Sequence, residues 1–322
     1  MKQLLGHDRN LEKLRFALSN GKLHHGLILA GPRGIGKATF ARIAAAMIVD
    51  GDGAHRQLTQ NGTHPDIVTI SRPPKEPPKA GEAPDPKAEL KRSINVEQVR
   101  RLQAMLTKRP TISQKRVIIV DSADDFETSA SNALLKSLEE PPEGCHFLLI
   151  SHASDTLLPT IRSRCQIMRF EPLGQDDMRA VLADIVSGSS PEDINMLARI
   201  GGGAPGMAAE FAGLDIVDLE TKMESIIASG DPDNAIRFSL ASKLALKAAQ
   251  PRYEAFLRRV PAHIAEFARE KSADLAIPAV NAWQEANELS ARAIALSLDK
   301  NAVILQMGSL LAGLNGHKQP SR

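Results

Sequence analysis

The 322-residue sequence has few of the residues that build several common kinds of site. Its two cysteines, Cys145 and Cys165, cannot by themselves make a four-thiolate zinc site or a disulfide framework. Aromatic residues are 3% of the chain, which disfavours stacking platforms for single-stranded nucleic acid. No apolar run approaches the roughly 18 residues of a membrane span, and the amino-terminal residues turn polar too early for a signal peptide. These absences predict a cytoplasmic protein that has no membrane partner.

The composition is otherwise that of an ordinary soluble chain. Hydrophobic residues make up 43% and charged residues 24% of the sequence, and the length allows two or three domains. The net charge of +2 is weakly basic, so it permits a nucleic-acid partner without requiring one.

Short apolar runs alternate with helical patterns over the first 170 residues. The helical patterns cover 37–49, 96–106 and 129–140, and the expected strands are 27–30, 66–70, 116–120, 146–151 and 165–170. Continuous apolar runs are typical of strands that are covered on both faces, as in a parallel sheet. The alternation therefore predicts an α/β doubly wound module.

Two other regions differ from this module. Residues 72–89 hold six prolines among lysines and glutamates, which predicts a solvated, extended loop inserted into the module. After Phe170 the strand signals fade, and 175–212 reads as short helices. From about 213 to 313 the chain has helical periodicity, with expected breaks at 230–232, Pro251 and Pro278.

A glycine-rich loop follows the first expected strand and opens the first long helix. This context supports a phosphate-binding loop, in which backbone N–H groups face phosphate oxygens and a lysine reaches the β- and γ-phosphates. The alternative is a glycine-rich turn with a surface lysine. The residues expected to bind ATP in and around this loop are Gly31, Pro32, Arg33, Gly34, Ile35, Gly36, Lys37, Ala38, Thr39 and Asp121.

The same loop lacks part of the machinery for hydrolysis. Ala38 stands where a Ser or Thr hydroxyl would bind Mg²⁺. Thr39 comes one position late, about 100° further around the helix, and is expected to point elsewhere. ATP binding would therefore be weak and rest on backbone contacts, with Mg²⁺ present only when ATP is bound.

Asp121 ends the apolar strand 117–120, where a metal-organising carboxylate belongs, although it could simply cap the next turn. Ser122 follows it and cannot polarise an attacking water as a carboxylate would. Asp124 and Asp125 either substitute for that carboxylate or solvate the turn. We therefore expect intrinsic hydrolysis to be very slow or absent.

Several further motifs accompany the glycine loop within the first 210 residues. They are Leu23-His24-His25-Gly26, Val120-Asp121-Ser122-Ala123-Asp124, the stretch from Asn132-Ala133-Leu134-Leu135-Lys136 to Glu139-Glu140-Pro141-Pro142, and Arg162-Ser163-Arg164-Cys165. With them the chain resembles the bacterial clamp-loader branch of the AAA+ family, which serves the DNA polymerase III holoenzyme. The third motif, followed about 20 residues later by Ser-Arg-Cys, is the most specific part of the resemblance.

The resemblance implies a RecA-like P-loop core (1–170), a small helical lid (171–212) and an all-α collar (213–322) that joins a hetero-pentamer. The implied partners are gamma/tau-like and delta-like subunits, the sliding clamp and primed DNA. In such assemblies the Ser-Arg-Cys arginine enters a neighbour's ATP site, so Arg164 is the expected catalytic residue in trans. The alternative interpretation is that Arg164 is an ordinary surface arginine at a strand edge.

Three departures from the family pattern bear on activity. Hydrolysing loader subunits carry a lid arginine after a glycine turn, but Gly203–Met207 contains none. Ser151-His152 stands where such subunits place a Thr or Asn sensor. Many relatives also carry a cysteine-rich zinc module between the loop and the acidic strand. Here that region has no cysteine, and His55 and His64 alone do not make a site, so no zinc is expected.

Residues 91–116 hold eight Lys or Arg against one acid, Glu97. On the 96–106 helix, Arg100 and Arg101 fall away from the apolar stripe. They either face primer–template phosphates without reading bases or belong to a solvated helix face.

The leading hypothesis is thus a non-motor loader subunit with little or no turnover of its own, inside a complex whose polymerase activity belongs to other chains. One alternative is an active ATP-hydrolysing subunit in which Thr39 and Asp124 rescue the chemistry. A solitary P-loop enzyme is the other alternative, which the collar-like helices and the trans arginine disfavour.

Overall fold

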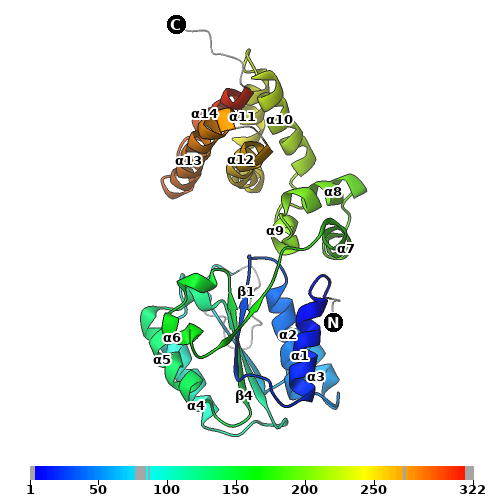
Figure 1. The fold of residues 1–322 in the computed structure, drawn as a ribbon. Coiled ribbons are helices and arrows are strands. Elements are labelled where there is room, and N and C mark those ends of the chain that lie inside the picture. Colours follow the sequence, from blue (N-terminus) through cyan, green and yellow to red (C-terminus); the bar gives the residue numbers. More distant parts are fainter. Residues whose placement is uncertain (1–3, 77–84, 86–87, 271–272, 316–322) are drawn as a thin grey trace. The chain divides into compact units, whose positions relative to one another are not determined.

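The computed structural model describes residues 4–76, 85, 88–270 and 273–315 (Figure 1). The chain forms two compact units, one of residues 1–181 with 201–207 and the other of residues 182–200 with 208–322. Helices α7 (Gln175–Ile185) and α9 (Pro205–Ala209) each have residues in both units. The division into core, lid and collar that the sequence predicts is finer than these two units and stays a prediction.

A five-stranded parallel sheet forms the centre of the first unit. Its strands have the spatial order β2-β3-β4-β1-β5 and are β1 (Gly26–Ala30), β2 (Ile67–Ser71), β3 (Arg116–Asp121), β4 (Cys145–Ser151) and β5 (Gln166–Arg169). Strand β4 therefore lies between the strand before the glycine loop and the strand that ends in Asp121. The predicted α/β core with a parallel sheet is confirmed.

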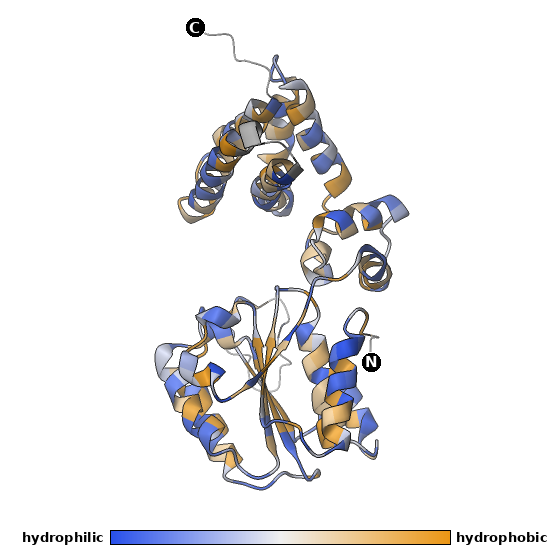
Figure 2. Cartoon of the chain, viewed as in Figure 1, coloured by the Kyte–Doolittle hydropathy of each residue, from blue (hydrophilic) through white to orange (hydrophobic). Residues whose placement is uncertain are grey.

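Helices cover both faces of this sheet (Figure 1). On one side lie α1 (Asp8–Ser19), α2 (Lys37–Val49) and α3 (Arg56–Asn61), and on the other α4 (Val96–Leu106), α5 (Thr128–Glu139) and α6 (Pro159–Arg162). Strands β1, β3 and β4 are buried along almost their whole length because both of their faces are covered. Figure 2 shows the hydrophobic colour concentrated on the strands and on the sheet-facing sides of the helices.

The main core lies between the sheet and the pair α4–α5. Alternate residues of β3 and β4 supply one side of it, among them Val120 and Phe147, and Leu102 and Leu134 supply the other. Helix α4 has the bounds that the sequence predicts. Its start is fixed by a capping box, since the Asn95 side chain accepts from the Gln98 backbone N at 3.1 Å and Gln98 accepts from the Asn95 backbone N at 3.2 Å.

The Pro-rich insert is closed at its base. Backbone N–H groups of Lys75 and Lys91 donate to the carbonyls of Glu89 and Pro73 at 2.7 and 2.8 Å. The predicted loop therefore leaves and re-enters the core at one place. Most of its tip, residues 77–84 and 86–87, lies outside the described residues.

Two single-turn 3₁₀ helices, η1 (Ala123–Asp125) and η2 (Ser154–Thr156), follow β3 and β4.

The second unit is all-helical, as predicted. Its helices are α8 (Pro191–Ile200), α10 (Ile216–Ser229), α11 (Ala235–Leu244), α12 (Gln250–Glu270), α13 (Ala273–Ala295) and α14 (Lys300–Ala312), with the 3₁₀ turns η3 (Lys247–Ala249) and η4 (Gly313–Asn315). A buried ion pair joins two of them, since Arg259 Nε on α12 donates to Glu220 Oε1 on α10 at 2.6 Å. None of the described helices combines the length and the apolar character that crossing a membrane would need.

Two of the expected breaks in this unit are confirmed and one is wrong. The break at 230–232 separates α10 from α11. Pro251 sits in the first turn of α12, where its missing N–H has no helical partner to lose. Pro278 instead lies inside α13, so it does not end the helix. Being close to the helix start, it removes one backbone hydrogen bond and leaves the rest of the ladder intact.

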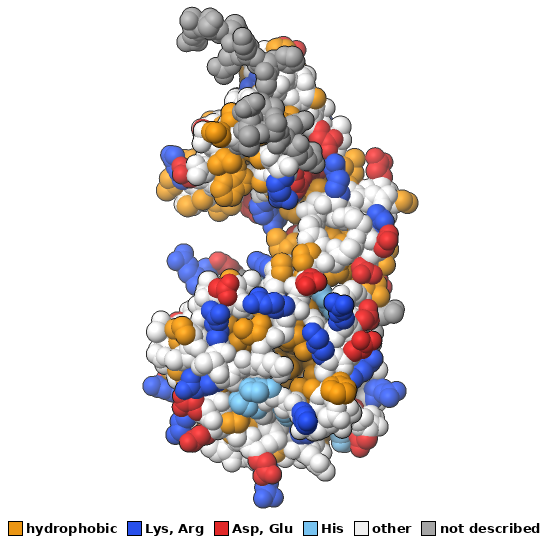
Figure 3. Space-filling view, viewed as in Figure 1, with side chains coloured by type: hydrophobic (Ala, Val, Ile, Leu, Met, Phe, Trp, Pro, Cys, Tyr) orange, Lys and Arg blue, Asp and Glu red, His pale blue; other side chains and the backbone are white. Residues whose placement is uncertain are grey.

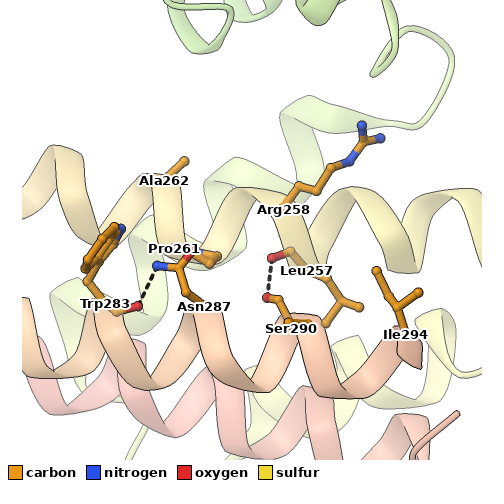
Figure 4. Close-up of a pocket in the computed structure, with 9 residues that line it drawn as sticks. Leu257, Arg258, Pro261, Ala262, Trp283, Asn287, Ser290 and Ile294 are labelled. Carbon is orange, nitrogen blue, oxygen red and sulfur yellow. Dashed lines mark hydrogen bonds between the residues drawn. The ribbon is translucent and has the colours of Figure 1, made fainter. Parts of the chain in front are cut away.

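Helices α12 and α13 run side by side and enclose a shallow, mainly apolar pocket of about 490 Å³ (Figure 4). Pro261 lies inside α12 and has no N–H to donate to the carbonyl of Leu257, four residues earlier. Ser290 of α13 replaces that donor, with its hydroxyl 2.7 Å from the Leu257 oxygen. A side chain of one helix thus completes the backbone hydrogen bonding of the other.

Candidate functional site

The glycine loop connects β1 to α2 at the carboxyl edge of the sheet. Gly31, Gly34 and Gly36 have φ values of 155°, 76° and 107°, and α2 begins at Lys37. At Gly34 and Gly36 the left-handed backbone favours glycine. At Gly31 the reason is space, because a Cβ there would lie 2.5 Å from the carbonyl oxygen of Phe170. The loop therefore has the strand–loop–helix setting that the sequence predicts.

Lys37 is turned into the loop. Its Nζ donates to the carbonyl oxygens of Gly31 and Pro32 at 2.5 and 2.6 Å, and the residue is 3% exposed. Burial lowers the pKa of Lys37 to about 8, against the opposing charges of Asp124 and Asp121. The ammonium that would reach a nucleotide phosphate is thus held by the loop's own carbonyl groups.

The two residues after Lys37 provide no hydroxyl beside it. Ala38 has no side-chain oxygen. Thr39 lines a different pocket of about 430 Å³, together with Arg42 of α2 and Thr69 of β2. The expectation that Thr39 points away from the loop agrees with this position.

Asp121 is the last residue of β3 and is half-buried. It lies close enough to Lys37 for its charge to act on the lysine pKa. Ser122 follows it and is 3% exposed, and its hydroxyl donates to Asp124 Oδ2 at 3.1 Å. The structure thus brings Lys37 and Asp121 together, but it gives Ser122 a structural contact within the turn.

Asp124 links the ends of two strands. Its carboxylate accepts hydrogen bonds from Ser122 Oγ, from Ser151 Oγ at 2.8 Å, and from the backbone N of His152 and Ala153 at 2.6 and 3.3 Å. Burial raises the pKa of Asp124, but these hydrogen bonds outweigh it and hold the pKa below its usual value. Four donors occupy this carboxylate, which leaves little acceptor capacity for an attacking water.

Asp125 is also engaged, in an ion pair with Arg72 at 3.2 Å. Of the two readings left open for Asp124 and Asp125, the contacts favour a role in shaping the turn. The sequence missed the link from Asp124 to Ser151 and His152 because those partners lie 27 and 28 positions away. The only sign of this link in the sequence is a buried strand end that is followed by two aspartates.

Residues 203–207 lie directly against the glycine loop. The backbone N of Gly206, in α9, donates to the Gly34 carbonyl at 2.8 Å. A Cβ at Gly34 would come within 2.6 Å of the Met207 backbone N, so the two segments meet backbone to backbone. His7 Nε2 is 2.8 Å from the Ile35 carbonyl oxygen, which can only accept, so the imidazole donates. Two loop carbonyls are therefore bonded to other parts of the same unit.

Arg164 lies at the opposite, amino edge of the sheet. Its NH1 donates to the Thr160 carbonyl at 3.0 Å and to Ser163 Oγ at 3.2 Å, and its NH2 is 2.7 Å from Glu139 Oε1. The Arg164 side chain is 34% exposed. Arg162, two residues earlier, instead pairs loosely with Asp155 at 3.6 Å.

Cys165 behaves as a packed side chain. Burial raises the pKa of its thiol to about 12, which makes a thiolate rare at neutral pH. Its Sγ lies 2.8 Å from the place that a Cβ on Gly26 would take. Glycine at the start of β1 thus lets the Ser-Arg-Cys turn approach the sheet.

The basic residues of α4 face solvent. Arg100 and Arg101 are exposed, while Val99 and Leu102 of the same helix are buried in the core. Arg100 NH1 pairs with Glu97 at 2.8 Å. Figure 3 shows Lys and Arg side chains mixed with Asp and Glu over the visible face of the chain. Contact of Arg100 and Arg101 with DNA stays a prediction.

The two histidines considered for a metal, His55 and His64, have ring centroids 5.9 Å apart. Across the residues that the structure describes, no three or more His, Cys, Asp and Glu side chains are grouped so that they could hold a metal ion.

Comparison with known proteins identifies a family for the chain. Residues 6–174 match the family model described as "DNA polymerase III, delta subunit". The delta' subunit of Pseudomonas aeruginosa DNA polymerase III is 33% identical over 199 residues, which are 59% of this chain and 56% of that protein. The Escherichia coli delta' subunit is 29% identical over 69% of this chain and 66% of that protein.

Other subunits of the same polymerase are also similar. A Mycobacterium bovis gamma/tau subunit is 33% identical over 63% of this chain, but this is only 35% of that longer protein. Among solved structures, a gamma subunit-related protein of Thermotoga maritima has a TM-score of 0.43 and 14% identity, covering 94% of this chain and 99% of that one. The matched region spans about half, or less, of the length of the first of these relatives. The family model covers more than half of the chain, and the chain belongs to the DNA polymerase III delta subunit family, with a resemblance to delta'.

Proposed function

We propose that the chain works as a delta'-type subunit of a DNA polymerase III clamp loader. In this role it is a non-motor AAA+ subunit of the cytoplasm that completes the loader ring. It offers Arg164 to the ATP site of a neighbouring subunit and helps to place the sliding clamp on primed DNA during replication. The family match and the delta' relatives support the complex, and the geometry of the two sheet edges supports the finer roles.

The observation that carries the proposal is the position of Arg164 relative to the chain's own glycine loop. Strands β1 and β5 are parallel, with Leu27 opposite Gln166 and Ala30 opposite Arg169. Arg164 precedes β5, whereas the loop follows β1, so the length of a strand separates them. That length is roughly 15 Å at about 3.3 Å per residue, too far for the arginine to reach its own loop. Arg164 can therefore stabilise a transferring phosphoryl group only in another chain.

The carboxyl edge supports a subunit without turnover of its own. Lys37 is bound to loop carbonyls, Ala38 offers no ligand to Mg²⁺, and Ser122 replaces the carboxylate that would polarise water. We expect ATP to bind weakly if at all, with Mg²⁺ only alongside it, and we expect no zinc.

The remaining roles follow from the family. We propose a core of residues 1–170, a lid of residues 171–212 and a collar of residues 213–322 that joins gamma/tau-like and delta-like subunits in a hetero-pentamer. Arg100 and Arg101 then contribute a weak, sequence-independent attraction to DNA phosphates. DNA synthesis belongs to the polymerase that the loader serves.

The test is the DNA-stimulated ATPase of the reconstituted loader, with wild-type protein or Arg164→Ala. A trans arginine is worth about 10³–10⁵ in rate at the site it serves, so we expect the loader's rate to fall by at least about tenfold. Arg162→Ala is the matched control and should leave the rate unchanged. Size-exclusion chromatography must show an intact ring, and the lone wild-type chain should be silent. An intact ring with an unchanged rate, or turnover by the lone chain, would overturn the proposal.

A further inference from the structure

Three sequence motifs that are far apart in the chain meet at the amino edge of the sheet. They are the 23–26 stretch before β1, the carboxyl end of α5, and the turn that contains Arg164. His25 Nε2 lies 3.0 Å from the carbonyl oxygen of Leu138, and Glu139 Oε1 lies 2.7 Å from Arg164 NH2. The proposed function uses only the arginine of this cluster and leaves its partners without a role.

The contacts around Arg164 fix its guanidinium on one side. A guanidinium carries five N–H donors. The Thr160 carbonyl and the Ser163 hydroxyl take up NH1, and the Glu139 carboxylate takes up one N–H of NH2. The Nε–H and the second N–H of NH2 remain, and no other described residue is recorded as bonding to them. Free guanidinium N–H donors of this kind can bind phosphate oxygens.

Glu139 is itself held in place. It is the last residue of α5, and the carbonyl of its neighbour Leu138 accepts a hydrogen bond from His25. Burial and the nearby charge of His24 lower the pKa of His25, against the opposing effect of this bond. The imidazole is therefore neutral at neutral pH and donates through Nε2. The end of α5 is tied to the segment that enters β1, next to the Ser-Arg-Cys turn.

We propose that Glu139 is a positioning residue for Arg164. Its carboxylate orients the guanidinium so that the two remaining donors stay available to the phosphate of a nucleotide bound by the neighbouring subunit. This rests on the proposed function of Arg164 as a trans arginine. The pair is about half-exposed, so it adds little to stability, and orientation is what it contributes.

A contact that sets orientation has a characteristic kinetic signature. A misplaced arginine weakens an interaction that is made mainly in the transition state, so kcat falls while KM for ATP stays nearly constant. It should also depend on the arginine, so the effect of removing Glu139 should vanish when Arg164 is already absent.

The experiment is a double-mutant cycle on the reconstituted loader with the full-length chain. Glu139→Ala, Arg164→Ala and the double variant are compared in DNA-stimulated ATPase, with kcat and KM measured separately. Glu140→Ala is the matched control, because Glu140 is adjacent and exposed and makes no recorded contact with Arg164. We expect Glu139→Ala to lower kcat by about tenfold at unchanged KM. The double variant should match Arg164→Ala, and Glu139→Gln, which keeps an acceptor oxygen, should recover part of the rate.

Other outcomes separate this inference from the function on which it rests. If Arg164→Ala lowers kcat but Glu139→Ala equals the wild type, or adds its full effect to Arg164→Ala, then Glu139 does not position the arginine and the trans role stands. The inference also fails if Glu140→Ala is as damaging as Glu139→Ala. If Arg164→Ala is without effect in an intact ring, both the trans role and the positioning role fall.

Discussion

The two edges of the parallel sheet use their polar side chains in different ways. At the carboxyl edge, Lys37 is bonded to loop carbonyls and Asp124 is saturated by four donors. At the amino edge, Arg164 is held on one side only and keeps about a third of its side-chain surface exposed. At the carboxyl edge, Lys37 and Asp124 are occupied by hydrogen bonds within the chain. At the amino edge, Arg164 is partly exposed to solvent and could act on a nucleotide bound elsewhere.

On the proposed function, this difference lets a subunit without ATP turnover of its own contribute an arginine to a neighbour's site. The two edges are separated by the length of a strand and share no hydrogen bond recorded between these groups. Substitutions such as Ala38 and Ser122 at one edge therefore leave the geometry at the other intact.

The largest expected effect is on stability at the carboxyl edge. Asp124→Ala removes the acceptor of four hydrogen bonds that join the ends of β3 and β4. We expect the free energy of unfolding to fall by about 2–4 kcal/mol, because the buried Ser122 and Ser151 hydroxyls lose their partner. Asp125→Ala breaks only a half-exposed ion pair and should cost less than about 1 kcal/mol. Urea denaturation of both variants measures this, and equal losses would refute the structural role of Asp124.

A smaller effect is expected from a conservative change at the amino edge. Arg164→Lys keeps the positive charge but loses the planar fork that allows bidentate binding and contact with Glu139 at the same time. The DNA-stimulated ATPase of the loader should fall by about tenfold, close to the loss in Arg164→Ala. A rate for Arg164→Lys near the wild type would mean that charge alone is what the neighbour's site needs.

The acid dependence of stability should distinguish the edges further. The pKa of Asp124 is lowered in the folded chain, so its contribution is fully present above the ordinary value of 3.8. That contribution is lost as pH falls through the lower, folded value. Thermal unfolding between pH 7 and pH 3 should show a decline at the acid end that is less steep in Asp124→Asn. Part of the slope should remain, because the pKa of Asp66 is lowered too, by hydrogen bonds that outweigh its burial. If the stability of Asp124→Asn falls with pH as steeply as that of the wild type, the decline comes from groups other than Asp124.

The smallest expected effect is on ATP turnover by the lone chain when the missing groups are put back. Ala38→Thr combined with Ser122→Glu returns the missing hydroxyl and carboxylate to the carboxyl edge. We expect no measurable ATP turnover by the lone chain, because Lys37 stays bound to the carbonyls of Gly31 and Pro32 and the Gly203–Met207 turn has no arginine. If turnover appears and Lys37→Ala abolishes it, the loop is open to nucleotide and the contrast between the edges is weaker than proposed.

The sequence predicts the elements of the core well because their signals are local. Apolar runs mark β1, β3 and β4, and the helical stripe marks α4 to the residue. Pro278 was misjudged because a proline near a helix start costs one hydrogen bond, and the packing of α13 on α12 compensates for it.

The contacts that define the candidate site are less accessible to sequence reasoning. The Glu139–Arg164 pair depends on the end of α5 lying beside the start of β5, which follows from the strand order rather than from either motif. The Gly206–Gly34 bond joins segments about 170 positions apart, and neither glycine carries a side chain whose type could signal a partner. The residue types at Ala38 and Ser122 predict that a hydroxyl and a carboxylate are missing. Only the fold shows which contacts Lys37 and Arg164 make.

The hydroxyl of Ser290 on the Leu257 carbonyl has a consequence for how the helical unit folds. In an isolated α12 the Leu257 carbonyl has no protein donor, because Pro261 cannot supply one, and it gains one only when α13 docks. Secondary structure in one segment is therefore completed by tertiary contact with the next, which makes the two helices a single cooperative element. Removing α13 should therefore destabilise α12 as well.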